Sequence, residues 1–116
     1  TIDNGIAAFD AAKYIKDLGL TLIITDHHKA SDELPLADAI VNPKRKDSTY
    51  PFDGICGAVV SWKVLRELYA NKNDANKYLD ILAIATVGDV VPLIDENRII
   101  VKEGLMLLAD LMGILT

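Results

Sequence analysis

Residues 20–28 read LTLIITDHH, a continuous apolar and β-branched run that changes abruptly to polar residues at Asp26. Runs of this kind are typical of a strand that is covered on both faces in a parallel sheet, so a strand is predicted over residues 20–25. Ligands of open α/β sheets bind beyond the carboxyl ends of the strands. The tripeptide Asp26-His27-His28 therefore stands where such a fold would place a functional site.

Hydrophobic periodicity and turn residues predict further elements on both sides of this strand. We expect helices over residues 6–18, 57–69, 78–87 and 95–111, a short strand over residues 38–41 and a surface loop over residues 44–54. Thr1-Ile2 is expected to be the end of a strand. This order of elements predicts the α/β class, as a three-layer-like domain with a small, mostly parallel sheet flanked by helices.

The apolar positions of the later helices predict which faces point inward. The helix over residues 78–87 is nearly all apolar and is expected to be buried. Asp95 is expected to be the N-cap of the last helix. The residues expected to face inward on the other two helices are Val60, Val64, Leu65, Leu68, Ile100, Leu105, Leu108 and Met112.

Length and composition limit the class of protein. A chain of 116 residues with 51% hydrophobic and 25% charged residues fits one small globular domain. The first residue is not methionine, there is no secretory signal and no apolar run approaches the length of a membrane span, so we expect part of a longer protein without a membrane partner. The single cysteine, Cys56, is expected to be a core residue in a reducing compartment, the cytoplasm.

The formal net charge of −5 argues against a general nucleic-acid-binding surface. Carboxylates that gather around divalent cations also make a chain acidic. Asp3 follows the predicted first strand, Asp26-His27-His28 follows the second, and Asp89 follows the helix over residues 78–87. Carboxylate oxygens and imidazole nitrogens together suit manganese, zinc or iron, so these positions are candidate ligands of a divalent cation.

Each candidate also has a structural interpretation. Asp3 or Asn4 could cap the first helix, Asp89 could end a helix, and the two histidines could lie in a solvated loop. The basic residues 44–46 could contact phosphate or simply be solvated. The sequence contains neither a dinucleotide-binding glycine motif nor a phosphate-binding P-loop, so neither of these nucleotide sites is expected.

Several blocks of this sequence resemble the DHH phosphoesterase family, and within it the RecJ single-stranded-DNA exonucleases. The tripeptide Asp26-His27-His28 with its strand is similar to the motif that gives the family its name, and residues 1–6 are similar to the preceding aspartate motif. Residues 86–93 resemble the later aspartate motif. Connecting blocks that resemble RecJ occur at residues 34–35, 40–43, 50–52, 56–58, 95–98 and 103–105.

The resemblance implies a site for two Mn²⁺ or Mg²⁺ ions. In it Asp3 bridges the ions, and His27 and Asp89 complete the ligands of one of them. The resemblance assigns His28 and Asp26 to catalysis: His28 would contact the scissile phosphate or the leaving oxygen, and Asp26 would orient a ligand. Residues that bind the rest of the substrate are not implied.

The resemblance further implies that residues 1–116 form a partial DHH domain. The family's upstream Asp-x-Asp motif, its C-terminal DHHA1 domain and RecJ's OB-fold are absent from this sequence. The expected function is a fragment of an exonuclease that digests single-stranded DNA from 5′ to 3′ in repair and recombination, inactive by itself. The alternatives are a DHH phosphodiesterase acting on short oligonucleotides, cyclic dinucleotides or pyrophosphate, and a non-catalytic scaffold of a replication complex.

Overall fold

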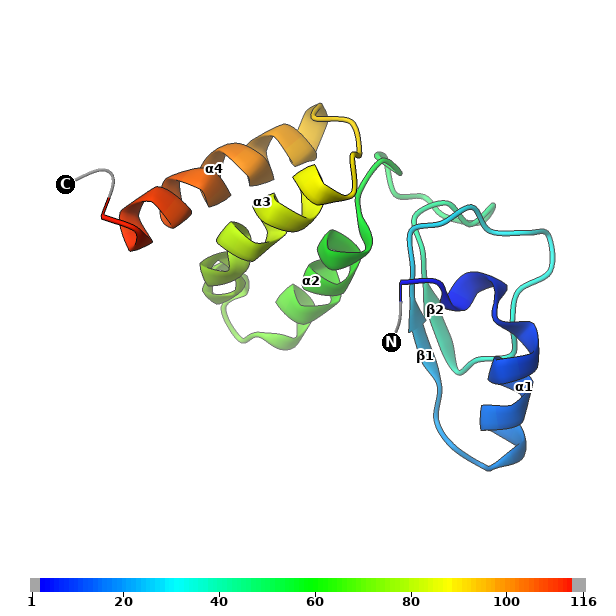
Figure 1. Cartoon of the computed structure of the whole chain (residues 1–116). Helices are drawn as coiled ribbons and strands as arrows, with labels where there is room; N and C mark the ends of the chain where they lie inside the picture. The colour runs from blue at the N-terminus through cyan, green and yellow to red at the C-terminus, as the bar shows by residue number, and fades with distance from the viewer. Residues whose placement is uncertain (1–2, 114–116) are drawn as a thin grey trace. The chain divides into compact units, whose positions relative to one another are not determined.

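The computed structural model describes residues 3–113, so the strand predicted at Thr1-Ile2 lies outside the described residues. The chain divides into two compact units, Thr1–Asp53 and Gly54–Thr116 (Figure 1). Within the described residues, every helix is too short or too polar to cross a lipid bilayer. The α/β class and the small parallel sheet are confirmed.

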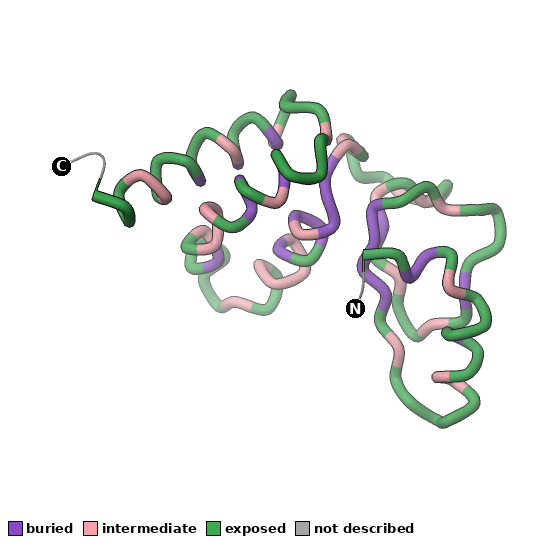
Figure 2. Tube along the Cα trace, in the orientation of Figure 1, coloured by how far each residue is buried: buried purple, intermediate pink, exposed green. Residues whose placement is uncertain are grey.

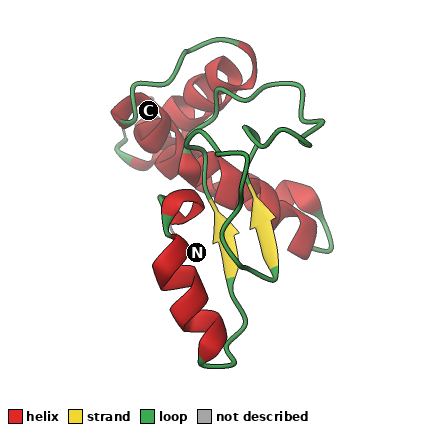
Figure 3. Cartoon of the chain, turned by 90° about the vertical axis from the view of Figure 1, so that its right-hand side faces the viewer, coloured by secondary structure: helices red, strands yellow, loops and turns green. Residues whose placement is uncertain are grey.

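The first unit contains the sheet. Its elements are η1 (Gly5–Ala7), α1 (Phe9–Asp17), β1 (Ile23–Thr25) and β2 (Ala39–Val41). The two strands run parallel, with Ile24 opposite Ile40 and Thr25 opposite Val41 (Figure 3). Their carboxyl ends therefore lie side by side, and the residues that follow β1 and β2 meet at one edge of the sheet.

Strand β1 begins later than the sequence pattern predicts. The Asp38 backbone N–H donates to the Leu22 carbonyl at 2.8 Å, and the Leu22 N–H donates to the Asp38 carboxylate at 2.7 Å. Lys16 Nζ donates to both oxygens of the same carboxylate, at 2.7 and 2.8 Å. A side chain thus takes the place of one ladder bond, and regular pairing starts at Ile23.

Replacing Asp38 with asparagine is expected to reduce the acid sensitivity of the fold. The hydrogen bond from Lys16, with that from the Leu22 N–H, holds the pKa of Asp38 below its ordinary value. The folded state therefore binds the proton less tightly than the unfolded state, so the stabilisation is present above the unfolded pKa of about 3.9 and is lost as the pH falls through the folded pKa. Thermal unfolding at a series of pH values from neutral to acidic measures the change.

The control for this prediction is Asp17→Asn. Asp17 pairs with Lys13, four residues away on an exposed face of α1. Within residues 3–113 it has no ion pair or hydrogen bond to either strand. This variant should keep the pH profile of the unmodified chain. If the melting temperatures of both variants depended equally weakly on pH, the hydrogen bond between Asp38 and Leu22 would have no special role.

The helix predicted over residues 6–18 is interrupted at Ala8, which has φ −90° and ψ 57°. Residues before the break form η1, and the Ile6 N–H, which would have no acceptor within a helix that starts at this residue, donates to the buried Asp26 carboxylate at 2.8 Å. Gly5 permits the close approach, since a Cβ built on it would lie 2.8 Å from Ile24 Cγ2. Gly5 and Ile6 therefore lie against the C-terminal part of β1 and the residue that follows it.

The second unit is helical. It consists of α2 (Gly57–Leu68), η2 (Lys72–Tyr78), α3 (Leu79–Gly88) and α4 (Asp95–Leu111). Helices α3 and α4 lie side by side (Figure 1). The Asn97 carboxamide, fully buried, donates to the carbonyls of Gly54 and Pro92, both at 2.8 Å, and so joins α4 to the segments that precede α2 and α4.

The beginning of α4 differs from its prediction. Asp95 is the first residue of the helix, with φ 46°, and Ile94 occupies the N-cap position without a side-chain capping bond. The prediction that Asp95 caps the helix is therefore wrong. A positive φ is tolerated by aspartate better than by most residues, which allows the chain to turn sharply into α4 here.

The inward faces of α2 and α4 were predicted only in part. Val60 and Ile100 are buried as expected, and Val64, Leu65 and Leu108 are half-buried. Leu68, Leu105 and Met112 are exposed, so their predicted burial is wrong. Leu68 is the last residue of α2, Leu105 lies in the C-terminal half of α4, and Met112 follows the last residue of α4. Figure 2 shows that α4 is mostly exposed toward its C-terminal end.

Helix α3 is buried on one face only. Leu82, Ala83 and Thr86 are buried, whereas Ile81 is 60% and Ile84 57% exposed. The prediction that this helix is buried is therefore confirmed for one face and wrong for the other. An apolar helix face that faces solvent in one unit is the kind of surface that other protein segments cover.

Candidate metal centre

Three of the predicted site residues come together at the carboxyl edge of the sheet. Asp3 lies just before η1. His27 and His28 come directly after Asp26, whose backbone N–H donates to the Val41 carbonyl at the end of β2. One ligand atom from each of the three lies within 4.8 Å of the others, and His27 Nε2 is 3.3 Å from Asp3 Oδ1. One carboxylate and two imidazoles at this spacing suit a divalent transition-metal cation.

Asp26 is the most buried member of the tripeptide, with no exposed surface. Its Oδ1 accepts the backbone N–H groups of His27 and His28, at 2.7 and 3.0 Å, and its Oδ2 accepts the Ile6 N–H at 2.8 Å. Burial raises the pKa of Asp26, but the hydrogen bonds from His28, Ile6 and His27 outweigh it and hold the pKa below its ordinary value. The ionised carboxylate thus joins the Asp3 segment to both histidines.

The orientation of His28 follows from the same carboxylate. Its Nδ1 lies 2.8 Å from Asp26 Oδ1, and an ionised carboxylate can only accept, so Nδ1 carries the proton. The Nε2 lone pair then faces a ligand or substrate when the ring is neutral. The rings of His27 and His28 are 4.4 Å apart between centroids, so the two nitrogen ligands serve one small region.

Structural interpretations of these residues are only partly confirmed. Asn4 makes no side-chain capping bond to η1, and the N-cap of α1 is Ala8, so the proposed capping role of Asp3 or Asn4 is wrong. His27 is buried, with 6% of its surface exposed, which contradicts a solvated loop position; His28 is exposed. Asp3 instead lies against His27.

Asp89 belongs to the second unit. It is the C-cap of α3, and its backbone N–H donates to the Ala85 carbonyl at 2.9 Å, so it does end a helix as one interpretation held. Its side chain is exposed. The cluster within the first unit therefore contains two of the three predicted metal ligands, Asp3 and His27, together with His28.

Asn42 lies at this edge but was not predicted to be a site residue, and in the sequence it stood out only as part of the RecJ-like block at residues 40–43. It follows β2 directly, is 5% exposed, and donates from Nδ2 to the His28 carbonyl at 2.9 Å. Its position was visible in the sequence, because an amide side chain directly after a strand falls at the same edge as the residues after the neighbouring parallel strand.

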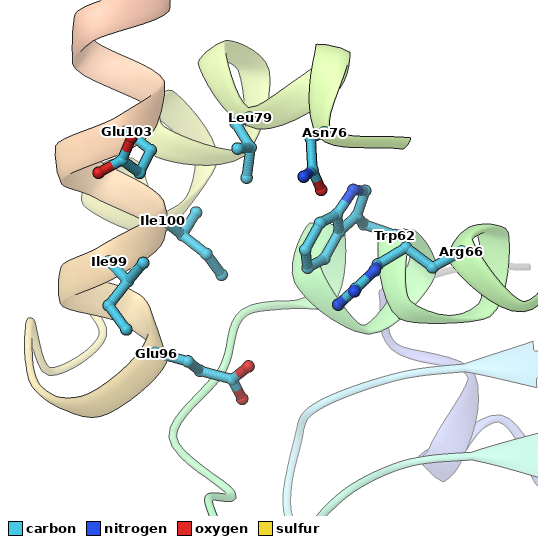
Figure 4. Close-up of a pocket in the computed structure, with 8 residues that line it drawn as sticks. All are labelled: Trp62, Arg66, Asn76, Leu79, Glu96, Ile99, Ile100 and Glu103. Atoms are coloured by element: carbon cyan, nitrogen blue, oxygen red, sulfur yellow. The ribbon is translucent and has the colours of Figure 1, made fainter. Parts of the chain in front are cut away.

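The second unit has a pocket of about 310 Å³ between α2, η2 and α4 (Figure 4). Its floor includes Trp62, whose indole donates to the Ala75 carbonyl at 2.8 Å, and the Arg66 guanidinium stacks on this ring at 4.7 Å. Glu96 at its rim pairs with Lys63 at 2.6 Å. These contacts identify the pocket as part of the helical packing, with a chemistry different from the Asp3–His27–His28 cluster.

Comparisons with known proteins give matches to a single family. The family model for the DHH family, N-terminal domain, matches residues 1–86. Two similar relatives are both named single-stranded-DNA-specific exonuclease RecJ. The one from Bacillus subtilis is 49% identical over 105 residues, and the one from Escherichia coli K12 is 34% identical over 118 residues.

These matches cover 90% of this chain but only 13% and 20% of the two relatives, so the chain spans a small part of their length. Among solved structures, the chain is similar to a crystal structure of exonuclease RecJ bound to manganese, with a TM-score of 0.72 and 29% identity. That match covers 91% of this chain and 27% of the other. With the family model matching both the Asp3 segment and the Asp26-His27-His28 motif, the chain belongs to the DHH family.

Proposed function

We propose that this chain is part of a metal-dependent exonuclease that hydrolyses phosphodiester bonds of single-stranded DNA. The observation that carries the proposal is the Asp3–His27–His28 cluster, whose ligand atoms lie within 4.8 Å of one another at the carboxyl edge of a parallel sheet. The names of the RecJ relatives support the substrate class. Roles in DNA repair and recombination and digestion from 5′ to 3′ belong to the same proposal.

Asp3 and His27 are proposed to hold a divalent cation, Mn²⁺ or Mg²⁺, and the family resemblance adds Asp89 to the proposed ligands. The manganese named for the RecJ structure and the mixed carboxylate and imidazole donors both favour manganese. Two bound cations would supply charge neutralisation at the phosphoryl oxygens and a water of lowered pKa. An Asp-x-Asp motif upstream of this sequence would complete the second position.

His28 is proposed to act on the substrate. Asp26 holds its Nδ1 at 2.8 Å, which orients the ring and stabilises a proton taken up at Nε2. Nε2 can therefore donate a hydrogen bond to a phosphoryl or leaving oxygen when protonated. Asp26 itself is enclosed, and we assign it the positioning of Asp3's segment, His27 and His28 rather than contact with the substrate.

Substrate assays on the full-length protein containing this chain test the proposal. With Mn²⁺ present, 5′-phosphorylated single-stranded DNA is expected to be degraded faster than duplex DNA, cyclic dinucleotides or pyrophosphate, and a chelator should stop the reaction. The 116-residue chain by itself should show no comparable turnover, because its ligand set is incomplete. Preferential hydrolysis of a small nucleotide would favour the other DHH phosphodiesterases, and no hydrolysis would favour a scaffold.

Metal binding provides a readout that does not depend on turnover. Calorimetric titration of Mn²⁺ into the chain should detect weak binding, and His27→Ala should weaken it at least about tenfold, since even residues that only support a ligand contribute 10- to 100-fold. Lys46→Ala, a change at an exposed residue outside the cluster, serves as the control. Identical isotherms for His27→Ala and the unmodified chain would contradict the ligand assignment.

The proposed compartment is the cytoplasm. Cys56 is a free, buried thiol in the described chain, and its Sγ lies 3.7 Å from the Thr86 hydroxyl. A structural thiol of this kind is compatible with a reducing environment. Fractionation of cells that produce the full-length protein tests this assignment directly.

A further inference from the structure

Asn42 connects the candidate metal centre to the basic loop formed by residues 44–46. Its Nδ2 donates to the His28 carbonyl at 2.9 Å, and its Oδ1 accepts the Lys44 backbone N–H at 2.8 Å. The side chain is 5% exposed, so solvent competes little for these bonds. The backbones of His28 and Lys44 are therefore held at a fixed offset by one carboxamide.

The three cations of this loop have different surroundings. Arg45 donates through Nε and Nη2 to the two oxygens of Asp47, at 2.9 and 2.6 Å, and through Nη1 to the Ile40 carbonyl. Lys46 pairs with Asp32 at 2.5 Å. Lys44 is exposed, and within residues 3–113 its ammonium has no ion-pair partner.

The cluster of ligands is anionic or neutral, and the whole chain carries a formal charge of −5. A polyanionic strand that enters such a site needs cations for the phosphates beside the one being cleaved, since phosphate contacts provide most of the affinity and set its position. Lys29 follows His28 and is also exposed, but only Lys44 has its backbone bonded to a side chain that also holds His28.

We propose that Lys44 is a substrate-binding residue whose ammonium binds a DNA phosphate next to the scissile one, and that Asn42 is the positioning residue that sets its distance from His28. This inference rests on the proposed function. The interpretation of residues 44–46 as a loop without a phosphate contact then applies to Arg45 and Lys46, whose charged groups pair with Asp47 and Asp32.

The test measures binding of 5′-phosphorylated single-stranded oligo(dT) to the full-length protein by fluorescence anisotropy over a series of NaCl concentrations, in Ca²⁺ to suppress turnover. Each phosphate contact on a single strand contributes about 0.7 to the slope of log K against log salt concentration. Lys44→Gln should reduce the magnitude of this slope by about 0.7. Lys46→Gln, which removes the same charge two residues away, should leave it unchanged.

The Asn42→Ala variant tests the positioning role. It should lower the slope as Lys44→Gln does, and adding Lys44→Gln to it should produce no further change in the slope. If Asn42→Ala has a lower melting temperature, its slope could reflect partial unfolding, and the slope of Lys44→Gln, a change at an exposed residue, then tests the proposal. Equal slopes for Lys44→Gln and the unmodified protein, or equal losses for Lys44→Gln and Lys46→Gln, would overturn the assignment of Lys44.

Cleavage of the same oligonucleotide by the unmodified protein is measured in parallel with Mn²⁺. Absence of cleavage would contradict the proposed function itself. Cleavage together with an unchanged slope in Lys44→Gln would overturn the Lys44 assignment and leave the proposed function in place.

Discussion

Replacing Asp26 with alanine is expected to lower the free energy of unfolding by about 4 kcal/mol, a large part of the 5–15 kcal/mol typical of a domain. The change leaves the backbone N–H groups of Ile6, His27 and His28 without their acceptor, and an unsatisfied buried donor costs about 1–3 kcal/mol. Urea unfolding of the variant beside the unmodified chain measures the loss.

The same variant should also lose metal binding at temperatures where it remains folded, because the Asp3 segment and the two histidines are no longer joined. Asp26→Asn should be intermediate: its carbonyl oxygen can still accept from His27 and His28, but its amide nitrogen meets the Ile6 donor. Asp47→Ala, which removes an exposed carboxylate paired with Arg45, should change stability little. Unfolding of Asp26→Ala at the same urea concentration as the unmodified chain would contradict the central role of this carboxylate.

Replacing Gly104 with alanine is expected to destabilise the second unit by about 3 kcal/mol, the upper part of the range for overpacked cores. A Cβ at this position would collide with the Leu79 carbonyl oxygen and lie 2.6 Å from Ala83 Cβ. Both obstacles belong to α3 and one is backbone, so relief requires α3 and α4 to separate. This cost exceeds the gain of up to about 1 kcal/mol that alanine usually brings to a helix.

Gly88→Ala is the matched control for this prediction. Gly88 is the last residue of α3, and a Cβ built there meets no atom within 4 Å. The variant should be neutral or stabilised by up to about 1 kcal/mol, because alanine loses less conformational entropy than glycine. Thermal unfolding should therefore show a lower melting temperature for Gly104→Ala and an unchanged or higher one for Gly88→Ala. A melting temperature of Gly104→Ala equal to that of the unmodified chain would show that the two helices can move apart at little cost.

The Asp26-His27-His28 motif divides its tasks by burial. Asp26 has no exposed surface and makes hydrogen bonds within the protein, His27 is nearly buried beside Asp3, and His28 is exposed. This gradient runs from the strand outward and matches the proposed roles, in which Asp26 positions the site and His28 contacts the substrate. Asn42 adds a second support from β2 by holding the His28 carbonyl.

Much of the local structure was predictable because it depends on neighbours in the sequence. Strand β2, helices α2 and α4 and the loop after Asn42 follow from apolar periodicity and turn residues, and their observed bounds lie close to the predicted ones. The placement of Asp3 and His27 at one edge was also predictable, since parallel strands bring their carboxyl ends together. The resemblance to DHH proteins added the expectation of two ions and of a role for His28 at the scissile phosphate.

The features that the sequence alone did not determine depend on contacts between residues far apart in the chain. Before the break at Ala8, Ile6 bonds to Asp26, 20 residues away, and at the late start of β1 Leu22 bonds to the carboxylate of Asp38, 16 residues further along the chain. The buried faces of α3 and α4 include the place where Gly104 packs closely against Leu79 and Ala83 of α3. The sequence by itself thus determined the elements and the chemical types at the sheet edge, whereas only the tertiary structure decided which side chains support the site and which face outward.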